Sequence, residues 1–406
     1  MSLKLKKRIP SLLVFFVVLY PKCLDYLSGD IWLIRIIYVL QIGLSMYFLF
    51  DTFVLKRANF DKETWGLFGL FTVFNLSYII SDLNAKVLSQ TLTINLRRYL
   101  VMVGILVYLE KKNQTRKIEI LNSLYYYLST LMLLNILCNI CFPNGIAKMS
   151  MYSAEGYLTW SDSVGFLDAD NRVSLFSLLY FYVANTYVKL HKYTKKKEDR
   201  IIILSYALVI FNTLISRSGS AIIALTVLII CKLLIRYKRL WGTMLSWKGI
   251  AVTAIFIGLF VSDKFSGIFV ILGKLFNKGT TLSGRTVIWS EAISKIAKSP
   301  ILGYGTLEEG AFFKVGTYTW YAHNQYLDLW LQGGILCLFM FMAIVIFLNK
   351  TNKSSCKIGM YQNFICVMIP FITVGVVEHF ILRNYYQFWV FVCISFALRN
   401  VWEEER

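Results

Sequence analysis

Long apolar runs dominate this chain and leave few folds open to it. They recur from one end to the other, each about 17 to 25 residues long, which is the length of helix that crosses a hydrocarbon core of roughly 30 Å. Only 16% of the 406 residues are charged, whereas an average soluble domain has roughly a quarter. The sequence therefore predicts an all-α integral membrane protein that crosses the bilayer many times.

The predicted spans number about twelve and place both chain ends on the same side of the membrane. They lie at roughly 9–27, 31–50, 64–81, 88–109, 118–142, 164–188, 201–216, 219–236, 246–262, 328–348, 358–378 and 380–398. The first is the weakest, because Pro21-Lys22 interrupts its apolar core. No repeat, flexible linker or soluble unit is evident, so residues 1–406 are expected to form a single membrane domain.

Positive charge sets the predicted orientation. Most of the 43 Lys and Arg residues lie at the two chain ends and in every second loop between spans. Cytoplasmic loops carry such an excess because positively charged loops stay inside during insertion. We expect a multi-pass protein of a bacterial cytoplasmic (inner) membrane with both termini in the cytoplasm. The net charge of +20 then serves topology and contact with the lipid bilayer, and no nucleic-acid partner is expected.

One predicted extracytoplasmic loop, 263–327 between the ninth and tenth spans, departs from this charge pattern. It carries Lys and Arg on the side where the orientation rule disfavours them. A phosphate-bearing ligand would explain the charge, and so would an ordinary surface loop. A helix from about Ser283 to Lys298 is predicted to lie in the outer interface. Its apolar residues share one face: Trp289, Ala292, Ile293 and Ile296.

Histidine and arginine supply the candidate catalytic groups. His323 lies where the long loop returns to the membrane, and histidine is well suited to proton transfer near neutral pH. Arg217, at the turn between the seventh and eighth spans, and Arg285, in the long loop, share its side of the membrane. An ionised group at membrane depth is costly, and the planar fork of arginine matches phosphate oxygens, so both are candidate phosphate ligands. His379, adjacent to Glu378, is a competing base with an adjacent carboxylate.

Arginines inside predicted spans and a short acidic motif have a weaker claim to function. Arg35 and the pair Arg97-Arg98 are interpreted as packing or snorkelling residues. Asp168-Ala169-Asp170 spells the D-x-D sequence by which many glycosyltransferases bind a metal, but it would equally cap the sixth span. No metal site and no cofactor are expected.

Several short motifs between about 170 and 340 lie before, within and after the long loop. They are Ser216-Arg217-Ser218-Gly219, Ser283-Gly284-Arg285 with Trp289, Ser299-Pro300-Ile301-Leu302-Gly303-Tyr304-Gly305, Ala322-His323-Asn324 and Gly333-Gly334. In order, spacing and intervening loop they resemble the O-antigen ligase and O-antigen polymerase family. Asn171 looks like a further position of that family.

The resemblance implies a metal-independent membrane glycosyltransferase of the GT-C type that uses undecaprenyl-diphosphate-linked oligosaccharides. His323 matches the catalytic histidine of the family, and Arg217 and Arg285 match arginines that handle the diphosphate. The remaining residues are expected to bind substrate: Asn171, Arg172, Ser283, Gly284, Asn324, Glu378 and His379.

The function predicted on this basis is polymerisation of a surface polysaccharide, a capsule or the O-antigen of lipopolysaccharide. A growing glycan would pass from undecaprenyl diphosphate to the terminal hydroxyl of a lipid-linked repeat unit. A ligase of the same family, which transfers the glycan to lipid A core, is the nearest alternative. A polysaccharide flippase or transporter is an alternative of another class, which the long loop disfavours. A separate flippase and a chain-length regulator are the expected protein partners.

Overall fold

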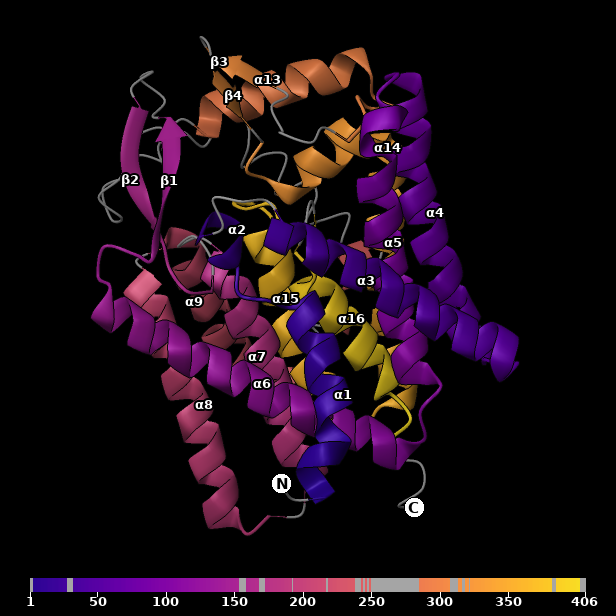
Figure 1. Ribbon diagram of the computed structural model, residues 1–406, viewed down its shortest axis with the longest axis vertical. Coiled ribbons are helices and arrows are strands. Elements are labelled where there is room, and N and C mark those ends of the chain that lie inside the picture. The colour runs from indigo at the N-terminus through magenta and orange to yellow at the C-terminus, as the bar shows by residue number, and fades with distance from the viewer. Residues whose placement is uncertain are drawn as a thin grey trace.

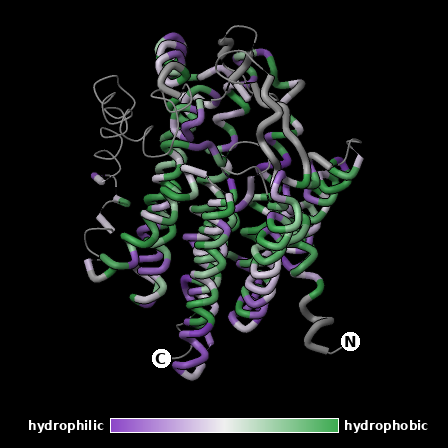
Figure 2. Tube along the Cα trace, turned by 90° about the vertical axis from the view of Figure 1, so that its left-hand side faces the viewer, coloured by the Kyte–Doolittle hydropathy of each residue, from purple (hydrophilic) through white to green (hydrophobic). Residues whose placement is uncertain are grey.

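The computed structural model of the protein is a bundle of helices (Figure 1). It describes residues 3–27, 32–152, 158–167, 172–191, 193–216, 218–237, 242–243, 245–246, 248–249, 285–306, 313–315, 318–320, 322–381 and 385–401. The helices of the bundle are hydrophobic over most of their length and hydrophilic mainly toward their ends (Figure 2). This is the pattern that the apolar runs predict.

The long helices follow the predicted spans in order. They are α1 (Leu3–Val18), α3 (Trp32–Phe50, continued by a π-helical turn Asp51–Leu55), α4 (Lys62–Asn84), α5 (Leu88–Glu110), α6 (Gln114–Cys141), α7 (Val173–Leu190), α8 (Lys195–Ser216), α9 (Gly219–Leu233), α14 (Gln325–Ser355), α15 (Ile358–Val374) and α16 (Gln387–Ala397). A short helix, α2 (Leu24–Leu27), follows the break at Pro21.

Seven described helices are long and apolar enough to cross a membrane, and four shorter apolar helices coincide with further predicted spans. The predicted span 246–262 lies almost entirely outside the described residues. A multi-pass helical membrane protein is therefore confirmed, while the total of about twelve spans and their sidedness stay predictions.

The two ends of the bundle differ in what they carry. One end, which we call the hairpin end, carries two antiparallel hairpins and the helix α13 (Arg285–Lys298). The hairpins are β1 (Ala147–Tyr152) with β2 (Leu158–Val164) and β3 (Phe313–Val315) with β4 (Tyr318–Trp320). At the other, the terminal end, α1 begins and α16 ends (Figure 1). One hairpin lies between α6 and α7 and the other lies in the predicted loop 263–327. Both are additions to the all-α prediction, because apolar periodicity does not report on such short strands.

The core of the bundle is built around α7. Every residue from Val173 to Val188 is buried, so this helix is enclosed on all sides, as its apolar character predicts. It packs against α8, α15 and α16, while α4 packs against α14 and α15 against α9. Segments distant in sequence thus meet along the centre of the membrane domain.

The helix α14 contains a break at Gly334 that is filled by the segment of the long loop directly after α13. Gly334 has φ 67° and ψ −175°, and a Cβ there would lie 1.9 Å from a carbonyl oxygen of the opposing segment, so only glycine fits. Tyr304 N donates to Leu331 O at 2.7 Å, and Ile335 N donates to Pro300 O at 3.1 Å. The inserted segment therefore satisfies backbone groups that a bilayer could not.

The helix α13 also packs against the head of α14. Its residues Ile288, Trp289, Ala292 and Ile296 are buried, whereas Ile293 is 46% exposed. The amphipathic helix predicted from the sequence thus exists, but its apolar face packs on protein, and Ile293 is not part of it. This contact brings the long loop to the candidate site.

Candidate functional site

His323 lies in the turn that leads into α14, at the hairpin end. Its φ is 46°, in the left-handed region that costs a non-glycine residue about 1–2 kcal/mol. The following residue, Asn324, caps α14: its side-chain oxygen accepts hydrogen bonds from Tyr326 N and Leu327 N at 3.0 and 3.1 Å. Strained backbone that is held in place by its surroundings concentrates at functional sites.

The residue before His323 is fixed as firmly. Ala322 N donates to Asp328 Oδ1 at 3.1 Å, and Ala322 O accepts from Trp289 Nε1 of α13 at 2.8 Å. All three of these residues are fully buried. The backbone of the histidine is therefore held both by the first turn of α14 and by the helix of the long loop.

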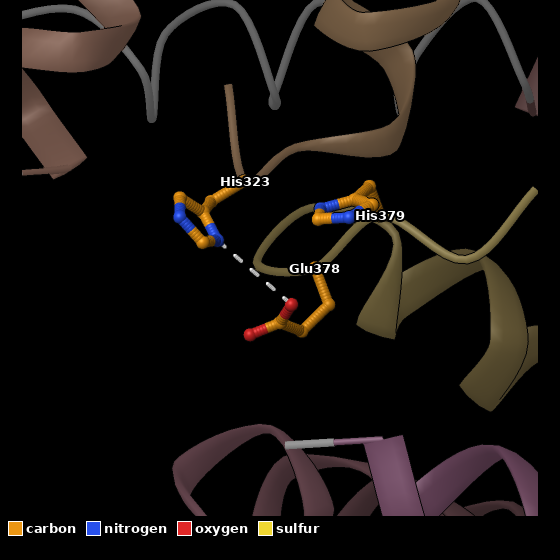
Figure 3. Close-up of side chains that lie close together, drawn as sticks. All are labelled: His323, Glu378 and His379. Atoms are coloured by element: carbon orange, nitrogen blue, oxygen red, sulfur yellow. Dashed lines mark ion pairs between the residues drawn. The ribbon is translucent and has the colours of Figure 1, made fainter. Parts of the chain in front are cut away.

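Glu378 faces His323 from the segment after α15. Its Oε2 lies 4.0 Å from His323 Nδ1 (Figure 3), and the carboxylate is 4% exposed while the imidazole is 21% exposed. His323 Nδ1 is buried and has no hydrogen-bond partner among the described residues. The other ring nitrogen points away from Glu378 in Figure 3. The imidazole can thus offer Nε2 to a substrate while Nδ1 faces a buried carboxylate.

A second histidine–carboxylate pair adjoins the first. His379 Nδ1 lies 3.9 Å from Asp328 Oδ2, and both side chains are almost completely buried. The two imidazole rings are 5.8 Å apart between centroids. The sequence suggested that Glu378 and His379 act as one base and its orienting group, but the structure pairs each with a residue of the other segment. Asp328, in the first turn of α14, is a site residue that the sequence analysis missed.

Hydrogen bonds between α14 and the α15–α16 connection fix the geometry of both pairs. Gln325 Oε1 accepts from Phe380 N and Ile381 N at 2.6 and 2.7 Å. Asn324 Nδ2 donates to Val376 O at 3.0 Å. Asn324 is predicted above to bind substrate, but its buried side chain is used to cap α14 and to hold this connection. Substrate binding by Asn324 stays a prediction.

The cluster of His323, Glu378 and His379 also has the composition of a metal site. One ligand atom from each residue lies within 4.8 Å of the others. Two imidazoles and a carboxylate are a common ligand set for zinc. The alternative metal motif, Asp168 and Asp170, lies outside the described residues. If the cluster supplies a base, activity should survive a chelator, whereas if it holds a metal, a chelator should abolish activity. Experiment can therefore separate the two roles.

Several predicted site residues lie where the structure gives no side chain. Those outside the described residues are Arg217, Asn171, Ser283 and Gly284. Arg285 is the first residue of α13, and only its backbone is described. Their approach to His323 therefore stays a prediction. Arg172 directly precedes α7 and donates a hydrogen bond to the Tyr385 hydroxyl.

The sequence held a signal for Asp328, the site residue that was missed. It is an acidic residue in the first turn of an apolar span. The pair Arg97-Arg98, interpreted from the sequence as packing or snorkelling residues, lies within another predicted span. Arg97 and Arg98 are 6% and 1% exposed, so they lie inside the protein and do not snorkel toward headgroups. Ionisable residues at membrane depth usually mark a functional site.

The fold and this site define a class: a multi-pass helical membrane protein with paired histidines and carboxylates at one end. Comparison with known families adds that residues 204–342 match the sequence model of the O-antigen ligase family. The match runs from α8 into α14 and includes His323 but not Glu378 or His379. No curated protein matches the chain. For this segment the resemblance noted in the sequence is confirmed, and it indicates a polysaccharide-processing membrane enzyme.

Proposed function

We propose that this protein polymerises a surface polysaccharide, a capsule or O-antigen, at the outer face of a bacterial cytoplasmic membrane. It moves a growing glycan from undecaprenyl diphosphate to the terminal hydroxyl of a lipid-linked repeat unit. The observation that carries the proposal is the position of His323, partly exposed in a strained turn and backed by the buried carboxylate of Glu378. That histidine lies inside the segment that matches the O-antigen ligase family.

The acceptor hydroxyl is a poor nucleophile until a base takes its proton. We assign this role to His323 Nε2, and the charge that the ring gains is stabilised by Glu378 at Nδ1. Their separation of 4.0 Å is long for a hydrogen bond, but such contacts often tighten only when substrate binds. The hydroxyl oxygen then bonds to the anomeric carbon, and the bond from that carbon to the diphosphate oxygen breaks.

The departing diphosphate needs positive charge. Arg217 and Arg285, both on the same predicted side of the membrane as His323, are the groups that we propose for it. A guanidinium binds two phosphate oxygens at once, and it keeps its charge when buried. Two arginines can therefore do the electrostatic work for which other enzymes use a metal ion, which is why we propose metal-independent transfer.

A ligase is the second candidate, and the name of the matched family favours it. A ligase would use the same donor, base and leaving group, and would transfer the finished chain to lipid A core. The two functions differ only in the acceptor. The described residues of the site serve either reaction.

Glycan profiling of a deletion strain separates the two functions. Loss of a polymerase leaves single repeat units on lipid A core or at the cell surface, whereas loss of a ligase leaves long chains on undecaprenyl diphosphate. We expect single repeat units in the deletion strain. We expect the same profile when the strain is complemented with a gene that carries His323→Asn. Long unligated chains would replace the polymerase proposal by the ligase. Restoration of the normal profile by His323→Asn would contradict the assigned site.

A further inference from the structure

Four basic side chains from separate parts of the chain gather at the hairpin end. Lys22 lies between α1 and α2, Arg97 and Arg98 lie in the half of α5 nearer the hairpin end, and Arg172 directly precedes α7. We call these four residues the basic cluster. None of them belongs to the segment that matches the O-antigen ligase family.

Lys22 and Arg172 meet around one aromatic ring. The guanidinium of Arg172 lies 4.6 Å from the centroid of Tyr385 and donates a hydrogen bond to its hydroxyl. Lys22 Nζ lies 5.7 Å from the same centroid, 3.6 Å from the centroid of Tyr20 and 3.6 Å from Asp25 Oδ2. The start of α16 thus joins residues that are far apart in sequence.

Arg97 and Arg98 are held by aromatic faces in the same region. The guanidinium of Arg97 lies 3.4 Å from the centroid of Tyr38, and that of Arg98 lies 3.9 Å from the centroid of Tyr78. Both are within electrostatic reach of the hydroxyl of Tyr386, the residue next to the ring shared by the other two cations. Stacking occupies the face of a guanidinium and leaves its N–H edge for an anion.

Burial makes such a gathering of positive charge costly unless an anion offsets it. Lys22 is 2% exposed and Arg98 is 1% exposed. Within the described residues Arg98 donates one hydrogen bond, to Asn95 Oδ1 at 2.7 Å, and its Nε has no partner. The carboxylate next to Asn95, that of Asp82, already accepts hydrogen bonds from three other groups. The buried charge of Arg98, which no ion pair offsets among the described residues, therefore points to an anionic ligand.

The basic cluster adjoins the histidine site. Tyr78 of α4 stacks against Arg98, and α4 packs against α14, whose first turn carries Asp328, the partner of His379. An anion bound by the basic cluster would therefore lie in the same part of the protein as the histidine site.

We propose that the basic cluster is a second anion site, which holds the diphosphate of the acceptor lipid. The inference rests on the proposed polymerase function, because a polymerase uses two lipid-linked diphosphates, one of which leaves and one of which is retained. Two diphosphates repel one another, so they need separate cationic sites. Arg217 and Arg285 take the donor in this scheme, and the basic cluster takes the acceptor.

The test is the number of undecaprenyl diphosphate molecules that the full-length protein binds in phosphatidylcholine nanodiscs. We expect two equivalents for the wild type and one for Arg98→Gln and for Arg172→Gln. Arg35→Gln is the matched control, because Arg35 lies in α3 at the same end but is exposed, and it should bind two. The buried Arg98 variant can fail to fold, so its melting temperature is measured, and the half-buried Arg172 supplies an independent variant.

Each other outcome has a defined meaning. A wild type that binds one equivalent, or cluster variants that bind two, would overturn the proposal. It is also overturned if the variants lose binding of phosphatidylglycerol but keep undecaprenyl diphosphate, since the cluster would then hold a lipid headgroup. If the cluster variants bind one equivalent but Arg217→Ala binds two, the proposal of a second site stands. The donor site proposed at Arg217 is then contradicted.

Discussion

The two ends of the bundle hold their charges in opposite ways. At the terminal end, Arg399 is 1% exposed and forms ion pairs with Asp61, Glu63 and Glu110, the last two at 3.0 Å. Lys117 adds a further pair to Glu110 at 3.3 Å. The guanidinium donates from all three of its nitrogens, so this cluster is closed and joins the end of α16 to α4 and α5.

At the hairpin end the histidines and carboxylates of the site are more widely spaced. Glu378 and Asp328 stand 4.0 and 3.9 Å from their imidazoles, and His323 holds a strained backbone. A closed cluster stabilises the fold, because removing its central Arg399 breaks three ion pairs at once. Contacts of this length add little stability, and substrate binding can still tighten them. The difference predicts that variants at the hairpin end lose activity and variants at the terminal end lose stability.

The largest effect is expected at His323. His323→Asn keeps a residue that tolerates the left-handed backbone but removes the base, so transfer should fall by at least about 100-fold. The measurement is transfer between a defined lipid-linked donor and acceptor at equal membrane abundance, with the melting temperature as a check on folding. A near-normal rate, or a His379→Ala variant that alone is inactive, would place the base elsewhere.

Arg399 should show the reverse behaviour. Arg399→Met breaks three ion pairs at once, although Glu110 keeps Lys117 as a partner, and it should lower the free energy of unfolding by about 3 kcal/mol, with little change in activity per folded molecule. Arg116→Met is the control, because Arg116 and Glu119 are an exposed pair worth about 0.5 kcal/mol or less. Denaturant unfolding in detergent measures both. Equal stability of the two variants would refute the closed-cluster interpretation.

A smaller effect is expected at Asp328. Asp328→Asn retains an oxygen for Ala322 N but removes the charge that faces His379. Loss of this ionic contact should cost about 1.4 kcal/mol, or about tenfold in rate. In a double-mutant cycle, His379→Ala should add little to Asp328→Asn, because the two residues act as one pair. Fully additive losses would show that they act independently.

The smallest effect is expected from chelators. If arginines neutralise the diphosphate and His323 is a base, purified enzyme should keep its activity in excess chelator. Inactivation that Zn²⁺ reverses would instead make His323, Glu378 and His379 metal ligands. Inactivation that Mg²⁺ or Mn²⁺ reverses, and that Asp168→Ala reproduces, would assign the metal to the acidic motif.

The sequence by itself determined the helices and the place of the histidine along them. A run of apolar residues long enough to cross the bilayer forms a helix wherever it lies, because every backbone polar group must be satisfied within the segment. The tenth span was predicted at 328–348 and is part of α14, Gln325–Ser355. His323 was accordingly expected at the entrance to this helix, where the structure has it.

Only the tertiary structure decided which side chains meet. Apolar helix faces are interchangeable partners in a membrane, so local pattern does not say that the α15–α16 connection covers the head of α14. That packing separates the neighbours Glu378 and His379 into different pairs and makes Asp328 part of the site. It also buries Arg97 and Arg98 beside Tyr386, far away in sequence. Spans follow from the local requirement to satisfy the backbone, whereas partners of buried charges follow from how the spans pack.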